Sequence, residues 1–172
     1  LSDNDSYPTL INCTISNNES NPISTGEETR AITLQNGGKI KIINSIIYGN
    51  NPDGLKILNH ANYCLDCYAE ISYSILGDGV YGDTGEAVLD NVISDNPMFV
   101  NPDDSDYTLQ STSPCIDAGD PESDLDPDGT RADIGAYPFY QIPGCTDEAA
   151  DFNYDSNANI DDGSCQYEYT IS

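Results

Sequence analysis

The sequence predicts an all-β protein whose strands repeat as the coils of a solenoid. Three copies of a short β-branched run followed by Asn, Gly or Asp carry this prediction: Leu10 to Asn18 (LINCTISNN), Ile42 to Asn51 (IINSIIYGNN) and Ile71 to Asp78 (ISYSILGD). Aligning Cys13 with Ser45 and Ser74 also aligns an apolar residue two positions later. A repeat period of roughly 20–50 residues is typical of solenoids, in which each coil buries its apolar face against its neighbours.

Further short strands are expected between these copies, because β-branched runs alternate with turn residues and helical spacing is rare. The expected strands are Ala31 to Leu34, Lys39 to Ile43, Leu55 to Leu58 and Ala87 to Ile93. Asn17, Asn50 and Asn51 are expected at corners, because Asn tolerates left-handed backbone and bonds its own turn. Several strands in each period indicate a coil of β-strands rather than one of paired helices.

The residues that follow the copies extend this prediction to a family. The copies, DNPMFV (Asp95 to Val100), DYTLQSTSPCIDAGD and DGTRADIGAYPF together resemble the C-terminal end of secreted right-handed parallel β-helix proteins of marine and gut bacteria. The resemblance covers residues 1–140 and implies that Pro97 to Pro138 forms an irregular cap over the last coil, whose strand edges would otherwise be unpaired. Because the chain begins in mid-repeat at Leu1, we expect it to be the C-terminal part of a longer protein.

Residues 141–172 form a second expected domain, a small acidic module. Its sequence GCTDEAADFNYDSNANIDDGSCQY resembles a short extracellular module of Bacteroidetes-like surface proteins and, less closely, the calcium-rich type 3 repeats of thrombospondins. Cys145 and Cys165 frame the module and are expected to be bonded, because so small a segment needs a crosslink, a metal or both. The expected calcium ligands are Asp151, Asn153, Asp155 and Asp162, with Asp161 as a near alternative. The alternative reading is a disulfide-closed loop that binds no metal.

A second candidate calcium loop lies in the irregular segment. Alternating oxygen side chains closed by a turn glycine suit calcium, which takes six to eight oxygen ligands. Here Gly129 closes the loop, but an EF-hand would have Glu where this chain has Gly135, and Asp133 is the expected substitute. The candidate ligands are Asp124, Asp126, Asp128, Thr130 and Asp133. The alternative is an acidic surface turn without an ion.

Charge and cysteine content limit the expected partners. Five Lys and Arg stand against thirty Asp and Glu, and the formal net charge of −25 argues against nucleic acid and anionic lipid surfaces, which it would repel. No stretch approaches the roughly 20 apolar residues of a membrane span. Six cysteines, an acidic surface and the expected calcium loops favour a secreted, cell-surface location.

The other four cysteines give no sign of metal or redox chemistry. Cys64 and Cys67 form a CxxC, but there is no second pair, and His60, the single histidine, cannot complete a zinc site. A redox role would need a helix N-terminus, whereas the neighbourhood reads as loop and strand. We therefore expect a local disulfide. Cys13 and Cys115 are expected to be buried small apolar residues, and whether they pair stays open.

Catalysis is not expected within this sequence, because its carboxylates cluster in Gly- and Pro-containing loops rather than as an acid–base pair in a cleft. Lys39 and Lys41 alternate on one expected strand and therefore share a face, expected to be the outer one.

The favoured interpretation is an extracellular structural or adhesive component, such as a stalk, surface or filament protein, rigidified by calcium. Its partners would be surface glycans or neighbouring copies of itself. One alternative is the non-catalytic C-terminal part of a carbohydrate-active enzyme, a polysaccharide lyase or glycoside hydrolase, since the fold hosts these as well as adhesins. Another is a carbohydrate-binding β-helix, in which Tyr63, Tyr68, Tyr73 and Tyr81 would form an exposed platform instead of packing on the coils.

Overall fold

The structure is a computed structural model that describes residues 7–19, 31–34, 37–51, 54–57, 67–77, 79–81 and 86–168. Within these residues the fold is all β, without an α-helix, and most strand pairs are parallel. The elements are β1 (Thr9–Ile11), β2 (Thr14–Ile15), β3 (Ile32–Leu34), β4 (Lys39–Ile43), β5 (Ile46–Ile47), β6 (Leu55–Ile57), β7 (Tyr68–Leu76), β8 (Val80–Tyr81), β9 (Glu86–Ile93), β10 (Phe99–Asn101), the 3-10 turn η1 (Pro102–Asp104), β11 (Asp106–Leu109), β12 (Pro143–Gly144) and β13 (Ile160–Asp161).

The strand copies pair in the register that the sequence repeat predicts. Ile15 of β2 pairs in parallel with Ile47 of β5, which pairs in parallel with Leu76 of β7. The serine positions two residues earlier are linked across spacings of 32 and 29 residues, which confirms the alignment. Strand β9, expected to lie between copies, instead pairs with β7 and adds a fourth member to the same sheet.

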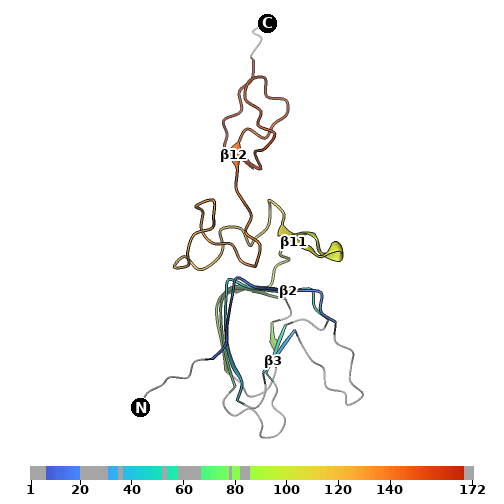
Figure 1. The fold of residues 1–172 in the computed structure, drawn as a ribbon, viewed down its shortest axis with the longest axis vertical. Coiled ribbons are helices and arrows are strands. Elements are labelled where there is room, and N and C mark those ends of the chain that lie inside the picture. The colour runs from blue at the N-terminus through green and yellow to red at the C-terminus, as the bar shows by residue number, and fades with distance from the viewer. Residues whose placement is uncertain are drawn as a thin grey trace.

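A row of left-handed residues bends this sheet. Asn12, Asn44, Tyr73 and Asn91 occupy equivalent positions in successive members and have φ angles of 50, 48, 46 and 51°. Left-handed backbone is uncommon for residues other than glycine, and Asn is among the types that tolerate it. The bend turns β2, β5 and the second half of β7 away from β1, β4 and the first half of β7, so that the sheet curls (Figure 1).

A ladder of serine hydroxyls supports the bend from one strand to the next. Ser45 Oγ accepts the N–H of Cys13 at 3.1 Å and donates to the carbonyl of Ile43 at 2.8 Å. Ser74 Oγ repeats the arrangement, accepting the N–H of Ser45 at 3.1 Å and donating to the carbonyl of Ser72 at 2.7 Å. The two serines are 1% and 0% exposed, and each satisfies backbone groups that the corner would otherwise leave without partners.

The asparagines expected at corners have different roles. Asn17 is left-handed, with φ 55°, as expected. Asn50 is buried and holds the coil from inside, because its Oδ1 accepts the N–H of Asn18 at 3.1 Å and its Nδ2 donates to the carbonyl of Ile15 at 2.9 Å. Asn51 forms an isolated parallel bridge with Glu19.

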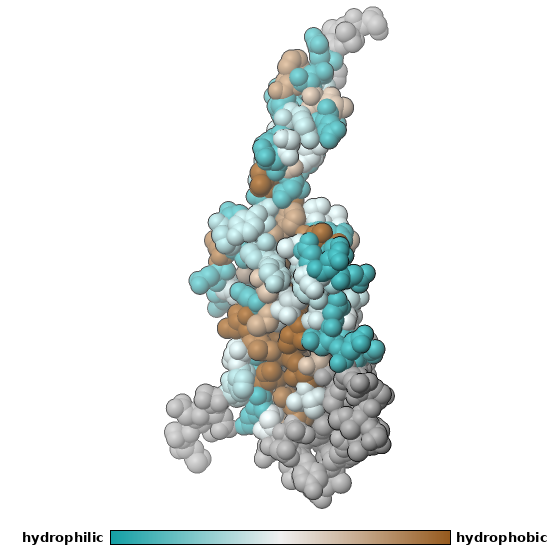
Figure 2. Space-filling view, turned by 45° about the vertical axis from the view of Figure 1, so that its right-hand side comes forward, coloured by the Kyte–Doolittle hydropathy of each residue, from teal (hydrophilic) through white to brown (hydrophobic). Residues whose placement is uncertain are grey.

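One hydrophobic core lies inside the curl. A second sheet, of order β3-β6-β8, faces the bent sheet across this core (Figure 1). The buried members of the core between the two sheets are Leu34, Ile40, Ile42, Ile47, Leu55, Cys67, Ala69, Ile71 and Leu76. Figure 2 shows hydrophobic side chains gathered over the strand region, whereas the C-terminal end is mainly hydrophilic.

A second core lies on the outside of the bent sheet. Ile46 and Ile75 point outward from β5 and β7, and both are buried by the segment at 97–139. Strands usually alternate buried and exposed residues, so two neighbouring buried residues in β5 mean that both faces are covered. The buried members of this core are Ile46, Ile75, Phe99, Leu109, Cys115 and Ile134.

The segment at 97–139 crosses the stack of coils instead of covering the last one, where the cap was expected. The N–H of Ala136 donates to Thr14 Oγ1 at 3.1 Å, and Asn17 Nδ2 donates to the carbonyl of Pro102 at 2.8 Å, so the segment reaches the first coil. β9 is the last strand of the bent sheet, and its residues Val88 and Leu89 are 42% and 50% exposed. The outward isoleucines of β5 and β7 give a physical reason for this placement, because the segment removes their apolar surface from water.

Asn44 anchors the crossing segment at the corner. The residue is 0% exposed, and its Oδ1 accepts the N–H of Asp120 at 2.6 Å while its Nδ2 donates to Ser123 Oγ at 3.0 Å. Its own carbonyl accepts the N–H of Gly135 at 2.8 Å. One asparagine therefore joins the coils to three points of a segment more than seventy residues away.

Residues 141–168 form a narrow unit beyond the crossing segment, on the side away from the coils (Figure 1). Its regular structure is one short parallel pair, in which Pro143 and Gly144 of β12 face Ile160 and Asp161 of β13. Side chains such as Phe152, 67% exposed, leave it little apolar core, so other interactions must hold it together.

Candidate functional site

The acidic loop around Gly129 is closed by its own backbone. The N–H of Gly129, which has φ 89°, donates to the carbonyl of Asp126 at 2.8 Å, and the N–H of Asp126 donates to the carbonyl of Thr130 at 3.0 Å. Asp128 Oδ1 accepts both the N–H and the hydroxyl of Thr130, at 3.1 and 2.7 Å, and its Oδ2 accepts the N–H of Gln141 at 2.7 Å. The expected turn is therefore present, and Asp128 ties it to the start of the C-terminal module.

Asp133 is a buried link between segments. It is 4% exposed, and its Oδ1 accepts the N–H of Asp117 at 2.7 Å while its Oδ2 accepts the N–H of Phe139 at 2.6 Å. Its own N–H donates to Asp126 Oδ2 at 2.8 Å. Asp133, the expected substitute for the missing glutamate ligand, thus has both carboxylate oxygens engaged by backbone.

The environments of these carboxyl groups shift their pKa values in opposite directions. Burial raises the pKa of Asp133 and of Asp126, and it outweighs the N–H donors that lower both. At Asp128 the N–H of Gln141 and the Thr130 hydroxyl and N–H lower the pKa. A cation beside Asp126 would lower its pKa, because an opposite charge favours the ionised form.

The donor chemistry of this loop suits calcium, but its ligands are not assembled. Within the described residues, no group of three or more His, Cys, Asp or Glu is placed to hold a metal ion. Asp124 is exposed and accepts no hydrogen bond in the described part of the chain, whereas Asp128 and Asp133 have both oxygens engaged. The structure therefore brings the candidate ligands to one loop without arranging them around a common point.

The C-terminal module is held by a disulfide and by asparagine side chains. Cys145 and Cys165 form the expected disulfide, with Cα atoms 4.8 Å apart. Asn153 Nδ2 donates to the carbonyl of Ser164 at 2.6 Å, and its Oδ1 accepts the N–H of Gln166 at 2.8 Å. Asn153, an expected ligand, thus has both ends of its amide engaged across the module.

The expected aspartate ligands of the module also bind backbone. Asp155, Asp161 and Asp162 each accept the N–H of the residue two positions later, at 2.9, 3.0 and 2.9 Å. Asp151 Oδ2 accepts the N–H of Glu168 at 2.7 Å. Such local bonds are what Asp side chains offer an irregular backbone. The same two-residue bond recurs at Asp106, Asp120, Asp128 and Asp147.

The other cysteines have structural surroundings. Cys67 is disulfide-bonded, and its expected partner Cys64 lies outside the described residues. Cys13 and Cys115 are both free thiols. Cys115 is 0% exposed, and burial raises the pKa of its thiol to about 11, which agrees with a buried apolar role. Cys13 is half-buried at the end of the serine ladder.

The lysines of β4 face outward, as expected. Ile40 and Ile42 are 7% and 0% exposed, which places Lys39 and Lys41 on the opposite face. Lys41 Nζ lies 2.7 Å from Glu70 Oε1 on the neighbouring strand, so it forms a cross-strand ion pair.

The tyrosines of the third coil have separate surroundings where the structure describes them. Tyr68 packs edge-on against Tyr7 with ring centroids 6.1 Å apart, and Tyr73, at the corner, lies under the guanidinium of Arg131. Tyr63 and the side chain of Tyr81 lie outside the described residues.

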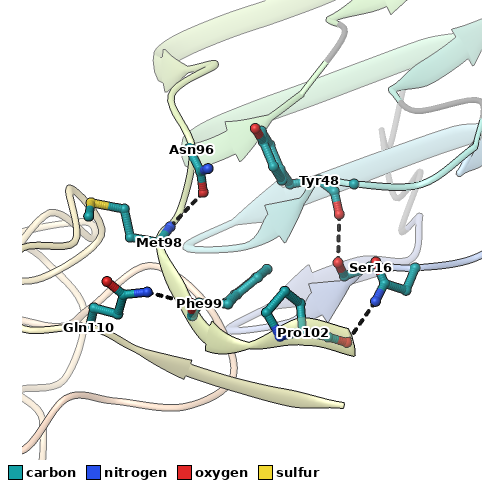
Figure 3. Close-up of a pocket in the computed structure, with 9 residues that line it drawn as sticks. Ser16, Tyr48, Asn96, Met98, Phe99, Pro102 and Gln110 are labelled. Atoms are coloured by element: carbon teal, nitrogen blue, oxygen red, sulfur yellow. Dashed lines mark hydrogen bonds between the residues drawn. The ribbon is translucent and has the colours of Figure 1, made fainter. Parts of the chain in front are cut away.

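A pocket that the sequence patterns did not predict lies between the coil turns and the crossing segment (Figure 3). It has a volume of about 260 Å³. Its lining residues are Ser16, Asn17, Tyr48, Gly49, Asn96, Met98, Phe99, Pro102 and Gln110. They come from three stretches far apart in the sequence, so only the folded chain brings them together.

No protein family, curated protein or solved structure matches this chain. Among the described residues, no helix has the length and apolar character of a membrane span.

Proposed function

We propose that this chain is the end of an extracellular right-handed parallel β-helix, followed by a calcium-binding module, and that it acts as a rigid structural or adhesive component of a cell surface. The observation that carries the proposal is the use of the acidic side chains. At seven aspartates a side-chain oxygen accepts the N–H two residues later, and these bonds build the segments that follow the coils. Asp104 also accepts a hydrogen bond, in this case from the side-chain amide of Asn101 at 2.6 Å.

The parallel stack supports the β-helix part of the proposal. Its corner residues and serine ladder repeat from strand to strand, as they would in a longer series of coils. The disulfide of the module supports an oxidising location.

Calcium would add to the stability of this arrangement. A net charge of −25 makes the folded state repel itself, and a cation that binds only the ordered loops stabilises them by its binding free energy. The candidate holders are Asp124, Asp126, Asp128 and Thr130 in the first loop. In the module they are Asp151, Asn153, Asp155, Asp161 and Asp162.

Thermal unfolding in 10 mM calcium, 10 mM magnesium or chelator tests the proposal. For a site with a Kd of about 0.1 mM, which is within the range of extracellular calcium modules, calcium adds about 2.7 kcal/mol. In a chain of this length that corresponds to a rise of about 5–10 °C in Tm. Magnesium is expected to raise the Tm only slightly, because it dehydrates reluctantly and demands octahedral geometry.

Variants with preserved hydrogen bonding assign the effect to a loop. Asp126→Asn and Asp155→Asn each keep an acceptor for the backbone N–H they bind but remove one charge. Each is expected to reduce the calcium-induced rise in Tm, whereas Asp103→Asn, in η1 and outside both loops, leaves it unchanged. A wild-type Tm that does not respond to calcium contradicts the proposal, and so does a rise that all three variants retain.

A further inference from the structure

We propose that the pocket beside Tyr48 binds a single neutral sugar ring of a glycan. This site is separate from the proposed calcium loops and does not depend on them. The lining includes the apolar surfaces of Tyr48, Phe99, Met98 and Pro102. It also includes the side-chain amides of Asn17, Asn96 and Gln110, the pocket amides. Pockets that bind small molecules combine a mostly apolar lining with a few polar groups that fix orientation.

The pocket amides are held in place and still have unused hydrogen-bonding atoms. Asn96 Oδ1 accepts the N–H of Met98 at 2.8 Å, which leaves its Nδ2 as a donor. Gln110 Nε2 donates to the carbonyl of Phe99 at 2.8 Å, which leaves its Oε1 as an acceptor. Asn17 likewise uses its Nδ2 on Pro102. Within the described chain, these remaining atoms and the Tyr48 hydroxyl make no hydrogen bond.

The backbone of the pocket is held in conformations that cost free energy. Met98 has φ 56° and Asn17 has φ 55°, both in the left-handed region. This region is unfavourable for a bulky side chain such as Met, and such residues gather at binding sites. Figure 3 shows Ser16 and Tyr48 from the coil turns facing Asn96, Phe99 and Pro102 from the segment that follows. The site is therefore built by two separate parts of the fold.

Charge and size select the ligand class. None of the nine lining residues is charged, although the chain carries a net charge of −25. An anion would be repelled by the molecule as a whole, and a cation would find no carboxylate in the lining. A hydrocarbon chain would leave the remaining atoms of the pocket amides without hydrogen-bond partners.

The size of the pocket points to a single ring. A volume of about 260 Å³ lies just below the usual range for drug-sized ligands. A neutral sugar has C–H groups for Tyr48 and Phe99, and its hydroxyl groups can both donate to and accept from the pocket amides.

Saturation-transfer NMR and calorimetry with methyl glycosides of glucose, galactose, mannose and N-acetylglucosamine test the proposal, with glucuronic acid as the anionic comparison. At least one neutral glycoside is expected to bind with a Kd of about 1–10 mM, which is ordinary for a dozen ligand atoms. Glucuronic acid is expected not to bind. Measurements in chelator keep the outcome independent of calcium.

Three isosteric variants locate the site. Asn96→Asp keeps the acceptor for Met98 but removes the donor, and Tyr48→Phe removes the hydroxyl; each is expected to weaken binding about fivefold, the equivalent of one hydrogen bond. Gln166→Glu, an exposed position of the module, adds the same charge as Asn96→Asp and is expected to change nothing. No binding of any neutral glycoside at about 50 mM would overturn the proposal. Preference for glucuronic acid, or equal binding by all variants, would overturn it too.

Discussion

Replacing Asn44 by alanine tests whether the crossing segment at 97–139 is anchored to the coils by this side chain. The variant leaves the half-buried N–H of Asp120 without its acceptor, which costs about 1–3 kcal/mol, and it removes the bond to Ser123, worth about 1 kcal/mol. Alanine at φ 48° adds about 1–2 kcal/mol of backbone strain. Asn12→Ala is the matched control, because Asn12 has φ 50° at the equivalent corner but is exposed.

The difference between the two variants isolates the anchor. Both variants place alanine at a left-handed position that asparagine tolerates better, so this cost is the same in the two. Asn44→Ala is therefore expected to be less stable than Asn12→Ala by about 2–4 kcal/mol, the value of the lost hydrogen bonds. This corresponds to about 4–16 °C in Tm for a chain of this length. Circular dichroism during thermal unfolding gives the Tm, and hydrogen exchange shows whether residues 113–139 lose protection before the coils. Equal losses of stability in the two variants would refute this account of the anchor.

Two further predictions concern the same region. Gly135→Ala would place a Cβ 2.7 Å from an isoleucine side chain of β5, so it is expected to cost about 1–3 kcal/mol more than Gly129→Ala, where nothing lies within 4 Å. Urea unfolding of the pair checks this, and similar midpoints would contradict it. The pKa of Asp128 is lowered in the folded state, so its contribution to stability is present above the unfolded pKa of about 3.9 and is lost as pH falls through the folded value. The difference in Tm between wild type and Asp128→Asn should therefore become smaller from pH 6 to pH 2. A difference that does not change with pH would exclude a stabilising contribution from the ionised Asp128 carboxylate.

The register of the coils could be predicted because local pattern and tertiary structure agree there. Cys13, Ser45 and Ser74 directly follow the left-handed corner in each copy. Two positions further on, Ile15, Ile47 and Leu76 point into the core. The fourth copy was harder to recognise. The corresponding position in β9 is Val92, which has no hydroxyl to continue the ladder, and β9 follows β7 after a short connection.

The place of the crossing segment could have been inferred from one signal. Ile46 and Ile47 are adjacent and both buried, and a strand with apolar residues on both faces needs cover on both sides. The roles of the acidic residues could not be read in this way. An aspartate that accepts backbone N–H groups, such as Asp133, is chemically the same as one that binds a cation, and only the folded backbone shows which donors lie beside it.

The varying connections between stacked strands have a consequence for how such a chain can evolve. Equivalent residues are 32 positions apart in one pair of coils and 29 in the next, yet the strands keep their pairing. Each coil is held by a few inward residues and a left-handed corner, so insertions and deletions elsewhere leave the architecture intact. Two proteins could share this arrangement while keeping very few identical residues in common.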